Sequence, residues 1–231
     1  KTIYLCWGIN SDRTIKGFLS RLKLRIIFKL SKVVLVNDIE TKIDIEKFGV
    51  QTKLVPYPVD TNFFRCESRN FEFDIICIGN NDRDESIVLS LANQGYKVAR
   101  ITRDPKVLDF YKDSKLVNLY YNLSYVDLRK LICLSRLMIM PIKKKCYHAA
   151  GQTSILEGLS CGKKIVILNS RLTDSFKNKG LFFCDDERCF FEIIPILLQE
   201  REESDFPNTL DSFNTIENFA KILSSNIKNI S

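Results

Sequence analysis

The segment 137–168 constrains the fold more than any other part of the chain. It begins with an apolar run over 137–140, which predicts a buried strand. Pro141 ends this run. A loop rich in lysine leads to Gly151, where a helical pattern begins, and Gly162 separates that helix from a second apolar run over 165–168. A strand, a helix and a strand in this order predict two parallel strands joined by a right-handed crossover. The chain is therefore expected to be an α/β protein.

The helix that begins at Gly151 has the pattern of an anion-binding site. The first N–H groups of a helix lack partners within it, and in open α/β sheets they face the crevice where ligands bind. Gly151, Gln152 and Thr153 would present these amides to a diphosphate. Glu157 follows one and a half turns later, where its carboxylate could accept two hydrogen bonds from a ribose diol. The alternative reading is an ordinary helix N-terminus followed by a surface glutamate.

Residues 149–167 read Ala-Ala-Gly-Gln-Thr-Ser-Ile-Leu-Glu-Gly-Leu-Ser-Cys-Gly-Lys-Lys-Ile-Val-Ile. This segment resembles the donor-binding signature of retaining GT-B glycosyltransferases of the family-4 type, a Glu-x7-Glu pattern ending in Glu-Ala-Met-Ala-x-Gly-x-Pro-Val-Val. Residues 33–37, 48–50 and 55–64 resemble the end of that family's first domain and its linker. Residues 75–84 resemble the first strand and turn of its second domain. The resemblance keeps this order from about residue 33 to 200.

The resemblance implies a GT-B fold, with two Rossmann-like doubly wound domains of which the first is truncated at its N-terminus. Residues 1–62 would be the C-terminal part of the acceptor-side domain and the linker, with a βαβαβ pattern. Residues 63–205 would be the donor-binding domain. Its strand patterns lie near 73–78, 97–102, 116–119, 137–140, 164–168 and 181–183, and its helical patterns lie between them, near 84–94, 105–111, 124–134, 152–161 and 172–179. Residues 206–231 would hold a helix that crosses back to the first domain.

The resemblance also assigns roles to the residues of the crevice. Glu157 would hold the nucleotide ribose, and the amides at 151–153 would hold the diphosphate. Gly79, Asn80 and Arg83 lie in the loop after the first strand of the second domain, which lines the same crevice. A guanidinium binds phosphate oxygens in pairs, so Arg83 is the expected counter-charge for the diphosphate; its alternative is a solvated arginine beside a capping aspartate, Asp84.

Two further positions of the loop before the helix bear on activity. His148 adjoins the donor site, where it would touch a phosphate or a sugar hydroxyl, or is simply a polar loop residue. The first glutamate of the Glu-x7-Glu pair falls at Ala149, so the carboxylate that contacts the transferred sugar in the family is missing. A subgroup with an Ala-Gly-Gln-Thr motif and a non-catalytic homologue both explain this difference. No catalytic residue is assigned from the sequence.

The implied activity is transfer of a sugar from a nucleotide-diphosphate-sugar donor to a glycan or lipid-linked acceptor, with retention of configuration. The sequence has one Asp-x-Asp triplet, at 82–84, and it is not read as a metal site because Arg83 is the expected phosphate ligand and Asp84 a helix cap. Basic side chains and helix N-termini are therefore expected to neutralise the leaving phosphates, with no metal and no further cofactor. The alternatives are a non-catalytic nucleotide-sugar-binding or scaffold protein, and another GT-B activity such as a nucleotide-sugar epimerase.

The segment 13–32 is strongly basic. Between Asp12 and Lys32 there are seven Lys or Arg residues against one acid, a net charge of +6 in a chain of net charge +7. Apolar residues alternate with them at helical spacing, which suits either an anionic membrane surface or a core-facing helix with a solvated basic side. Nucleic acid is not an expected partner, because aromatic residues do not interleave with these charges.

Eight cysteines are scattered through the chain without the paired spacing of a metal site. Their positions predict small core residues, with neither a disulfide framework nor a zinc site, and a reducing compartment. No apolar run reaches the ~18 residues that a membrane-spanning helix needs. The expected location is the cytoplasm, either free or peripheral on the inner face of the membrane.

Overall fold

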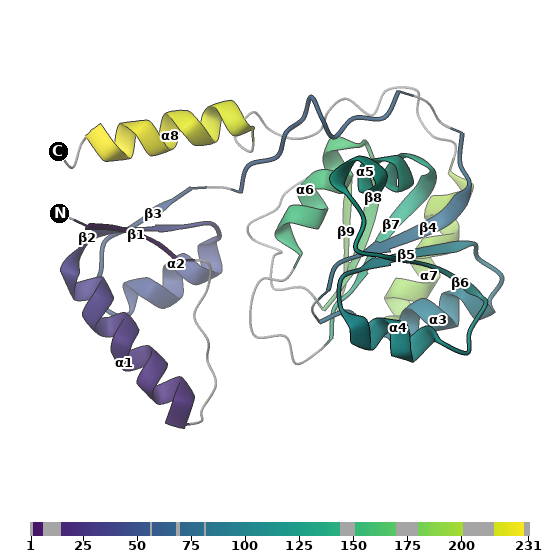
Figure 1. Ribbon diagram of the computed structural model, residues 1–231, viewed down its shortest axis with the longest axis horizontal. Coiled ribbons are helices and arrows are strands. Elements are labelled where there is room, and N and C mark those ends of the chain that lie inside the picture. Colours follow the sequence, from purple (N-terminus) through teal and green to yellow (C-terminus); the bar gives the residue numbers. More distant parts are fainter. Residues whose placement is uncertain are drawn as a thin grey trace.

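The computed structural model describes residues 2–6, 15–55, 57–67, 70–80, 82–143, 151–169, 180–200 and 215–228. These residues form two parallel sheets, one with strand order β1-β2-β3 and one with strand order β6-β5-β4-β7-β8-β9. Helices pack on both faces of each sheet (Figure 1). The architecture is therefore α/β, as predicted.

The three-stranded sheet alternates with two helices along the chain. Its elements are β1 (Thr2–Cys6), α1 (Ile15–Leu30), β2 (Ser31–Val36), α2 (Ile39–Glu46) and β3 (Thr52–Leu54). Successive side chains of β2 point to opposite faces, so Val34 and Val36 pack against α1 and α2. Val33 and Leu35 pack on the other face against α8 (Ile216–Lys228), which lies beside this sheet in Figure 1.

The six-stranded sheet consists of β4 (Phe73–Ile78), β5 (Val98–Thr102), β6 (Val117–Tyr121), β7 (Ser135–Pro141), β8 (Lys164–Leu168) and β9 (Leu181–Cys184). Its helices are α3 (Glu85–Asn93), α4 (Pro105–Tyr111), α5 (Tyr125–Cys133), α6 (Gln152–Ser160) and α7 (Glu187–Gln199). Helices α3, α4 and α7 cover one face, and α5 and α6 cover the other. The strand order reverses between β4 and β7, and this is where open parallel sheets bind ligands.

Both methionines of the chain lie on β7 and set the position of α6. A Cβ atom on Gly158 would lie 2.8 Å from the Met138 sulfur, and one on Gly151 would lie 1.9 Å from the Met140 methyl carbon. Both methionines are fully buried. The two glycines therefore leave room for these long side chains, and α6 lies close over the end of β7.

The predicted elements agree closely with those observed. The strands expected at 73–78 and 164–168 and the helix at 105–111 have the observed bounds, and the other described elements differ by a few residues at their ends. Asp84 caps α3 by accepting a hydrogen bond from the Ser86 N–H, and Ser124 caps α5 in the same way from Asp127. A helix expected at 172–179 lies outside the described residues.

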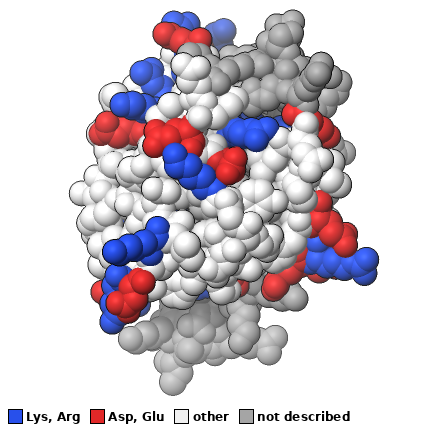
Figure 2. Space-filling view, turned by 90° about the vertical axis from the view of Figure 1, so that its right-hand side faces the viewer, with Lys and Arg blue, Asp and Glu red and all other residues white. Residues whose placement is uncertain are grey.

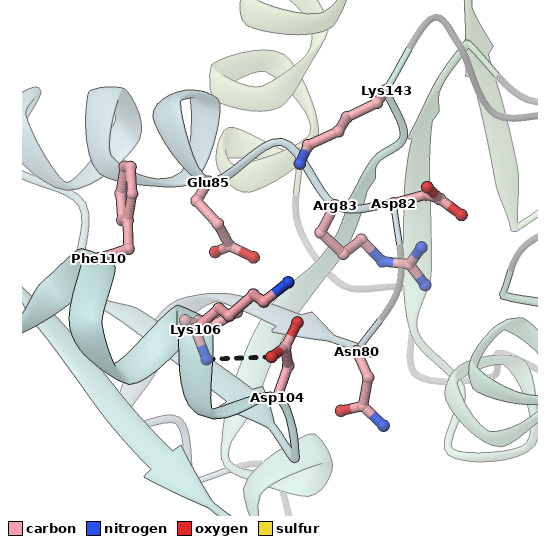
Figure 3. Close-up of a pocket in the computed structure, with 9 residues that line it drawn as sticks. Asn80, Asp82, Arg83, Glu85, Asp104, Lys106, Phe110 and Lys143 are labelled. Carbon is pink, nitrogen blue, oxygen red and sulfur yellow. Dashed lines mark hydrogen bonds between the residues drawn. The ribbon is translucent and has the colours of Figure 1, made fainter.

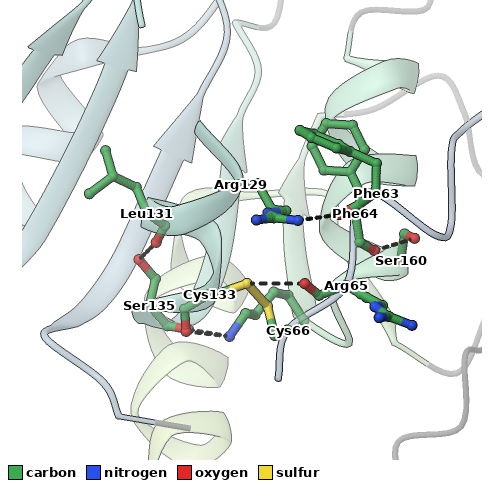
Figure 4. Close-up of a disulfide and its surroundings, with 10 residues drawn as sticks. Phe63, Phe64, Arg65, Cys66, Arg129, Leu131, Cys133, Ser135 and Ser160 are labelled. Carbon is green, nitrogen blue, oxygen red and sulfur yellow. Dashed lines mark hydrogen bonds between the residues drawn. A yellow bond between two sulfur atoms is a disulfide. The ribbon is translucent and has the colours of Figure 1, made fainter. Parts of the chain in front are cut away.

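The prediction that the chain has no disulfide is wrong. Cys66 and Cys133 are joined, with an S–S distance of 2.02 Å (Figure 4). They are 67 residues apart, and only the fold brings the segment before β4 to the end of α5, so spacing gives no sign of the bridge. The bridge also removes the reason for placing the protein in a reducing compartment. Cys77, Cys161 and Cys184 are free and buried, as predicted for core cysteines.

The surface of the six-stranded unit mixes both signs of charge. On the face shown in Figure 2, basic and acidic side chains alternate around a large uncharged area. The described residues on that face therefore form no extended patch of one sign. Among the described helices, none combines the length and apolar character needed to span a bilayer.

Candidate functional site

The loop between β4 and α3 is folded so that Arg83 points inward. Asp82 adopts a positive φ of 57°, and its carbonyl accepts a hydrogen bond of 2.9 Å from the Lys143 N–H after β7. The Asp84 N–H donates to the Pro141 carbonyl at 2.7 Å. These bonds fix the loop on the end of β7. Arg83 is consequently only 4% exposed, and its Nε donates to the Ile78 carbonyl at 3.0 Å.

The Arg83 guanidinium lies against two glycines. Its Nη2 would be 2.7 Å from a Cβ on Gly79 and 2.8 Å from a Cβ on Gly151, so neither position has room for a side chain. Both glycines have positive φ, 123° and 90°. Gly151 is the N-cap of α6 and provides no side-chain cap. The guanidinium and the start of α6 thus place positive charge at one point, as an anion site requires.

Glu157 lies in a cavity of about 390 Å³ on the α5–α6 face of the sheet. Thr153, one turn earlier, and residues of the linker line the same cavity. Burial raises the pKa of Glu157 from 4.5 to about 7, and the nearby Arg103 partly opposes this rise. Within the described chain the carboxylate makes no hydrogen bond. A half-buried carboxyl group without such a bond is disposed to bind hydroxyl groups of a ligand.

Phe63, Phe64 and Tyr125 form an aromatic wall of this cavity. Phe63 and Phe64 meet edge to face with ring centroids 5.0 Å apart, and the Tyr125 ring meets Phe64 at 6.3 Å. The Arg103 guanidinium lies 5.9 Å from the centre of the Tyr125 ring. An aromatic wall facing one carboxylate suits a ligand with a flat ring and a neighbouring pair of hydroxyl groups.

The Gln152 side chain connects the two sheets. It is 5% exposed, and its Nε2 donates to Asp38 Oδ2 at 3.2 Å. Asp38 is also the N-cap of α2, where it accepts a hydrogen bond from the Thr41 N–H. The first turn of α6 is thereby held against the three-stranded unit. The backbone N–H of Gln152 belongs to the first turn of α6, while its side chain makes a separate contact with Asp38.

The structure does not bring every predicted site residue together. Asn80, Arg83 and Lys143 line a second cavity of about 380 Å³ beside α3 and α4, whereas Thr153 and Glu157 line the first. Figure 3 shows Lys106 and Lys143 reaching toward its interior, whereas the Arg83 guanidinium points away from Glu85. Asn80 Oδ1 accepts a hydrogen bond from the Arg103 N–H, so it reaches the Glu157 cavity only through Arg103. His148 and Ala149 lie outside the described residues.

Four residues near Glu157 were not predicted: Arg103, Tyr125, Phe63 and Phe64. Arg103 follows β5 directly, at the carboxyl edge of the sheet, and this position was the available signal. Tyr125 follows the Ser124 cap at the same edge. The two phenylalanines belong to the linker, and no sequence pattern places a linker against a particular helix.

The fold defines the class: the chain has the GT-B fold of glycosyltransferases. Sucrose-phosphate synthase from Thermosynechococcus elongatus superposes with a TM-score of 0.76 at 12% identity, over 99% of this chain and 67% of that one. Anabaena HepE, solved with UDP and glucose, gives 0.73 at 13% identity, over 98% and 71%. TarM gives 0.68 at 13% identity, over 96% of this chain and 49% of its own.

The chain thus spans about two thirds of the first two neighbours and about half of TarM. No protein-family model and no curated protein matches the sequence. At sequence identities this low, the structural similarity shows a shared fold and nothing about activity.

Proposed function

We propose that this protein is a glycosyltransferase that uses a nucleotide-diphosphate sugar as donor. The observation that carries the proposal is the Glu157 cavity, in which a half-buried carboxyl group faces an aromatic wall one and a half turns from the uncapped start of α6. Few ligands match all three features. A nucleoside diphosphate has a base for the wall, a ribose diol for the carboxylate and a diphosphate for the helix.

The donor would lie along α6. Its base packs near Phe63 and Tyr125, and the ribose hydroxyls donate to Glu157. The diphosphate meets the N–H groups of 151–153 and the Arg83 guanidinium, which lies beside Gly151. Gly79 serves this site by leaving room for the guanidinium, and Asn80 serves it by positioning Arg103. His148 is proposed from the sequence as a further contact to the nucleotide-sugar donor.

The proposed chemistry follows from the positive charge at the N-terminus of α6. When the bond between sugar and phosphate breaks, negative charge grows on the leaving diphosphate, and Arg83 with the α6 amides stabilises it in a water-poor crevice. These fixed charges supply the neutralisation that a divalent ion gives elsewhere, so no metal is part of the proposal. The leaving phosphate oxygen takes the proton of the acceptor hydroxyl, and the configuration of the sugar is retained.

The ligands bound to the structural neighbours support this reading. HepE was solved with UDP and glucose, and a TarM variant of S. aureus with UDP and α-GlcNAc-glycerol. We infer that the acceptor is a glycan or a lipid-linked sugar that approaches from the three-stranded unit. Residues 1–62 and 206–231 are proposed as the acceptor-side domain with its linker and its returning helix, and 63–205 as the donor domain.

The test is calorimetric titration with UDP-, GDP-, ADP- and dTDP-sugars, followed by product analysis. We expect one base to bind in the micromolar range and Glu157→Gln to weaken it by more than tenfold. Arg188→Lys, on the exposed surface of α7, is the matched control and should bind normally. Transfer to an added acceptor supports the proposal. Binding without transfer or hydrolysis would indicate a non-catalytic protein, and epimerised donor would indicate an epimerase.

Helix α1 supports a second partner, an anionic membrane surface at its cytoplasmic face. Leu22, Ile26 and Leu30 follow one another at four-residue spacing and are 46%, 55% and 73% exposed, with Lys23 and Arg25 exposed beside them. An apolar stripe flanked by cations fits the interface of an anionic bilayer. Ile26→Asp should abolish sedimentation with phosphatidylglycerol vesicles, whereas Ile43→Asp on α2 should not. Equal sedimentation of both variants would contradict this partner.

A further inference from the structure

The linker segment that carries Phe63 and Phe64 of the aromatic wall is anchored at three points (Figure 4). Arg129 donates to the Phe63 carbonyl at 3.1 Å, and its guanidinium lies 4.9 Å from the centre of the Phe63 ring. The Ser160 hydroxyl donates to the Phe64 carbonyl at 2.6 Å. Two residues later the Cys66–Cys133 disulfide joins the linker to the end of α5. The linker segment 63–66 is thus fixed to both helices of this face.

Only one of these three points is a bond that can be made and broken by redox chemistry. Cys66 and Cys133 are both half-buried, so a small reductant can reach the bridge from solvent. The Cys161 sulfur lies within 4.8 Å of both bridged sulfurs but is 6% exposed. Burial raises the pKa of Cys161 to about 12, with Lys163 opposing the rise, so it stays a thiol and does not displace the bridge.

We propose that Cys66–Cys133 is a reversible redox site that controls the stiffness of the aromatic wall and thereby the affinity of the adjoining cavity for nucleotide. The identity of the ligand rests on the proposed function. The reactant is a dithiol of the thioredoxin or dithiothreitol class. Its thiolate attacks one bridge sulfur, the S–S bond breaks, and a mixed disulfide forms. The second thiol of the reductant then attacks this intermediate. The bridge gains two electrons and two protons, and the reductant leaves as a disulfide.

Reduction removes one anchor and leaves two. The hydrogen bonds from Arg129 and Ser160 still hold the carbonyl groups of Phe63 and Phe64, and Phe64 is 6% exposed. The linker segment therefore stays in contact with α5 and α6, but its backbone gains conformational freedom. A ligand that needs the wall in place must then order it on binding. The affinity should fall by about threefold to tenfold, the cost of ordering one or two side chains. The oxidised protein is therefore the tight-binding form.

The experiment compares the full chain in oxidised form and after dithiothreitol. Peptide mapping first verifies the 66–133 link. Hydrogen–deuterium exchange then follows residues 57–67, and calorimetry follows binding of UDP, GDP, ADP and dTDP. We expect faster exchange and weaker binding on reduction. Cys133→Ser should match the reduced protein in both conditions, and Cys66→Ser repeats the test from the linker side. Cys189→Ser, which removes an exposed free cysteine, should behave as wild type.

Equal exchange over 57–67 in both states would overturn the proposal, as would faster exchange with unchanged nucleotide affinity. The wild-type comparison needs no substitution, so a variant that fails to fold leaves the decision intact. If none of the four nucleotides binds the oxidised protein, the proposed function fails. The exchange rates then still decide whether the bridge holds the wall.

Discussion

Replacing Glu157 by glutamine should change both the stability of the free protein and its affinity for donor, each with its own pH dependence. The carboxyl group has a pKa of about 7 in the folded protein and 4.5 as its ordinary value, because burial disfavours its charge. Between pH 4.5 and 7 the folded protein keeps a proton that the unfolded chain has lost. Stability therefore falls as the pH rises through this window and stays low above it.

The magnitude follows from the shift. A shift of this size is worth at most about 3 kcal/mol, and partial solvent exposure reduces it to about 1–2 kcal/mol. Glu157→Gln has no charge to bury. At pH 8 its melting temperature should exceed that of the wild type by about 2–8 °C, since 1 kcal/mol corresponds to roughly 2–4 °C for a chain of this size. At pH 4, where the wild-type carboxyl group is protonated, the two proteins should melt together.

Donor affinity should move in the opposite sense. The ionised carboxylate accepts two hydrogen bonds from a diol, and at pH 6 only about a tenth of Glu157 is ionised, against about nine tenths at pH 8. A nucleotide-diphosphate sugar has no phosphate that titrates near neutrality, so it isolates this group. Its dissociation constant should be about tenfold larger at pH 6 than at pH 8 for the wild type and constant for Glu157→Gln. A wild-type affinity that does not change between these pH values would refute the reasoning.

Three other perturbations have defined outcomes. Gly151→Ala places a Cβ at a φ of 90°, 1.9 Å from Met140 and 2.8 Å from Arg83, and should lower the free energy of unfolding in urea by about 2–5 kcal/mol. Gly95→Ala is the control: its φ is 95° but the space around it is open, and it should lower that free energy by about 1 kcal/mol. Equal losses would show that the contacts do not matter. Arg83→Lys should weaken donor binding by about tenfold to a hundredfold in calorimetry, because an ammonium lacks the planar pair of N–H donors with which a guanidinium binds two phosphate oxygens; unchanged affinity would remove Arg83 from the site. Reducing the Cys66–Cys133 bridge, whose sequence separation is 67, should lower the free energy of unfolding by up to about 4 kcal/mol, and identical urea midpoints with and without reductant would contradict this.

Local patterns were enough to predict most of the fold. The apolar runs of the six-stranded sheet are buried strands, and the helix caps at Asp84 and Ser124 lie where side-chain chemistry places them. The start of α6 at Gly151 followed from the residue itself, since a left-handed cap favours glycine. These features depend on neighbours within a few residues along the chain.

What the sequence did not reveal depends on contacts between distant segments. The wall of Phe63 and Phe64 forms because Arg129 and Ser160, far along the chain, hold their carbonyl groups. The disulfide joins residues 67 apart for the same reason. Gln152 was expected only as an amide at the α6 mouth, but its side chain reaches Asp38 of the other unit. Residue type alone does not specify such partners.

The most direct test of the account is a crystal structure of the protein with the nucleotide-diphosphate sugar that binds tightest. We expect both ribose hydroxyls within about 3 Å of the Glu157 carboxylate, hydrogen-bond distance for charged acceptors, and diphosphate oxygens at the first N–H groups of α6 and at Arg83. A nucleotide seated in the cavity beside Lys106 and Lys143, with Glu157 in contact with solvent alone, would contradict the central claim.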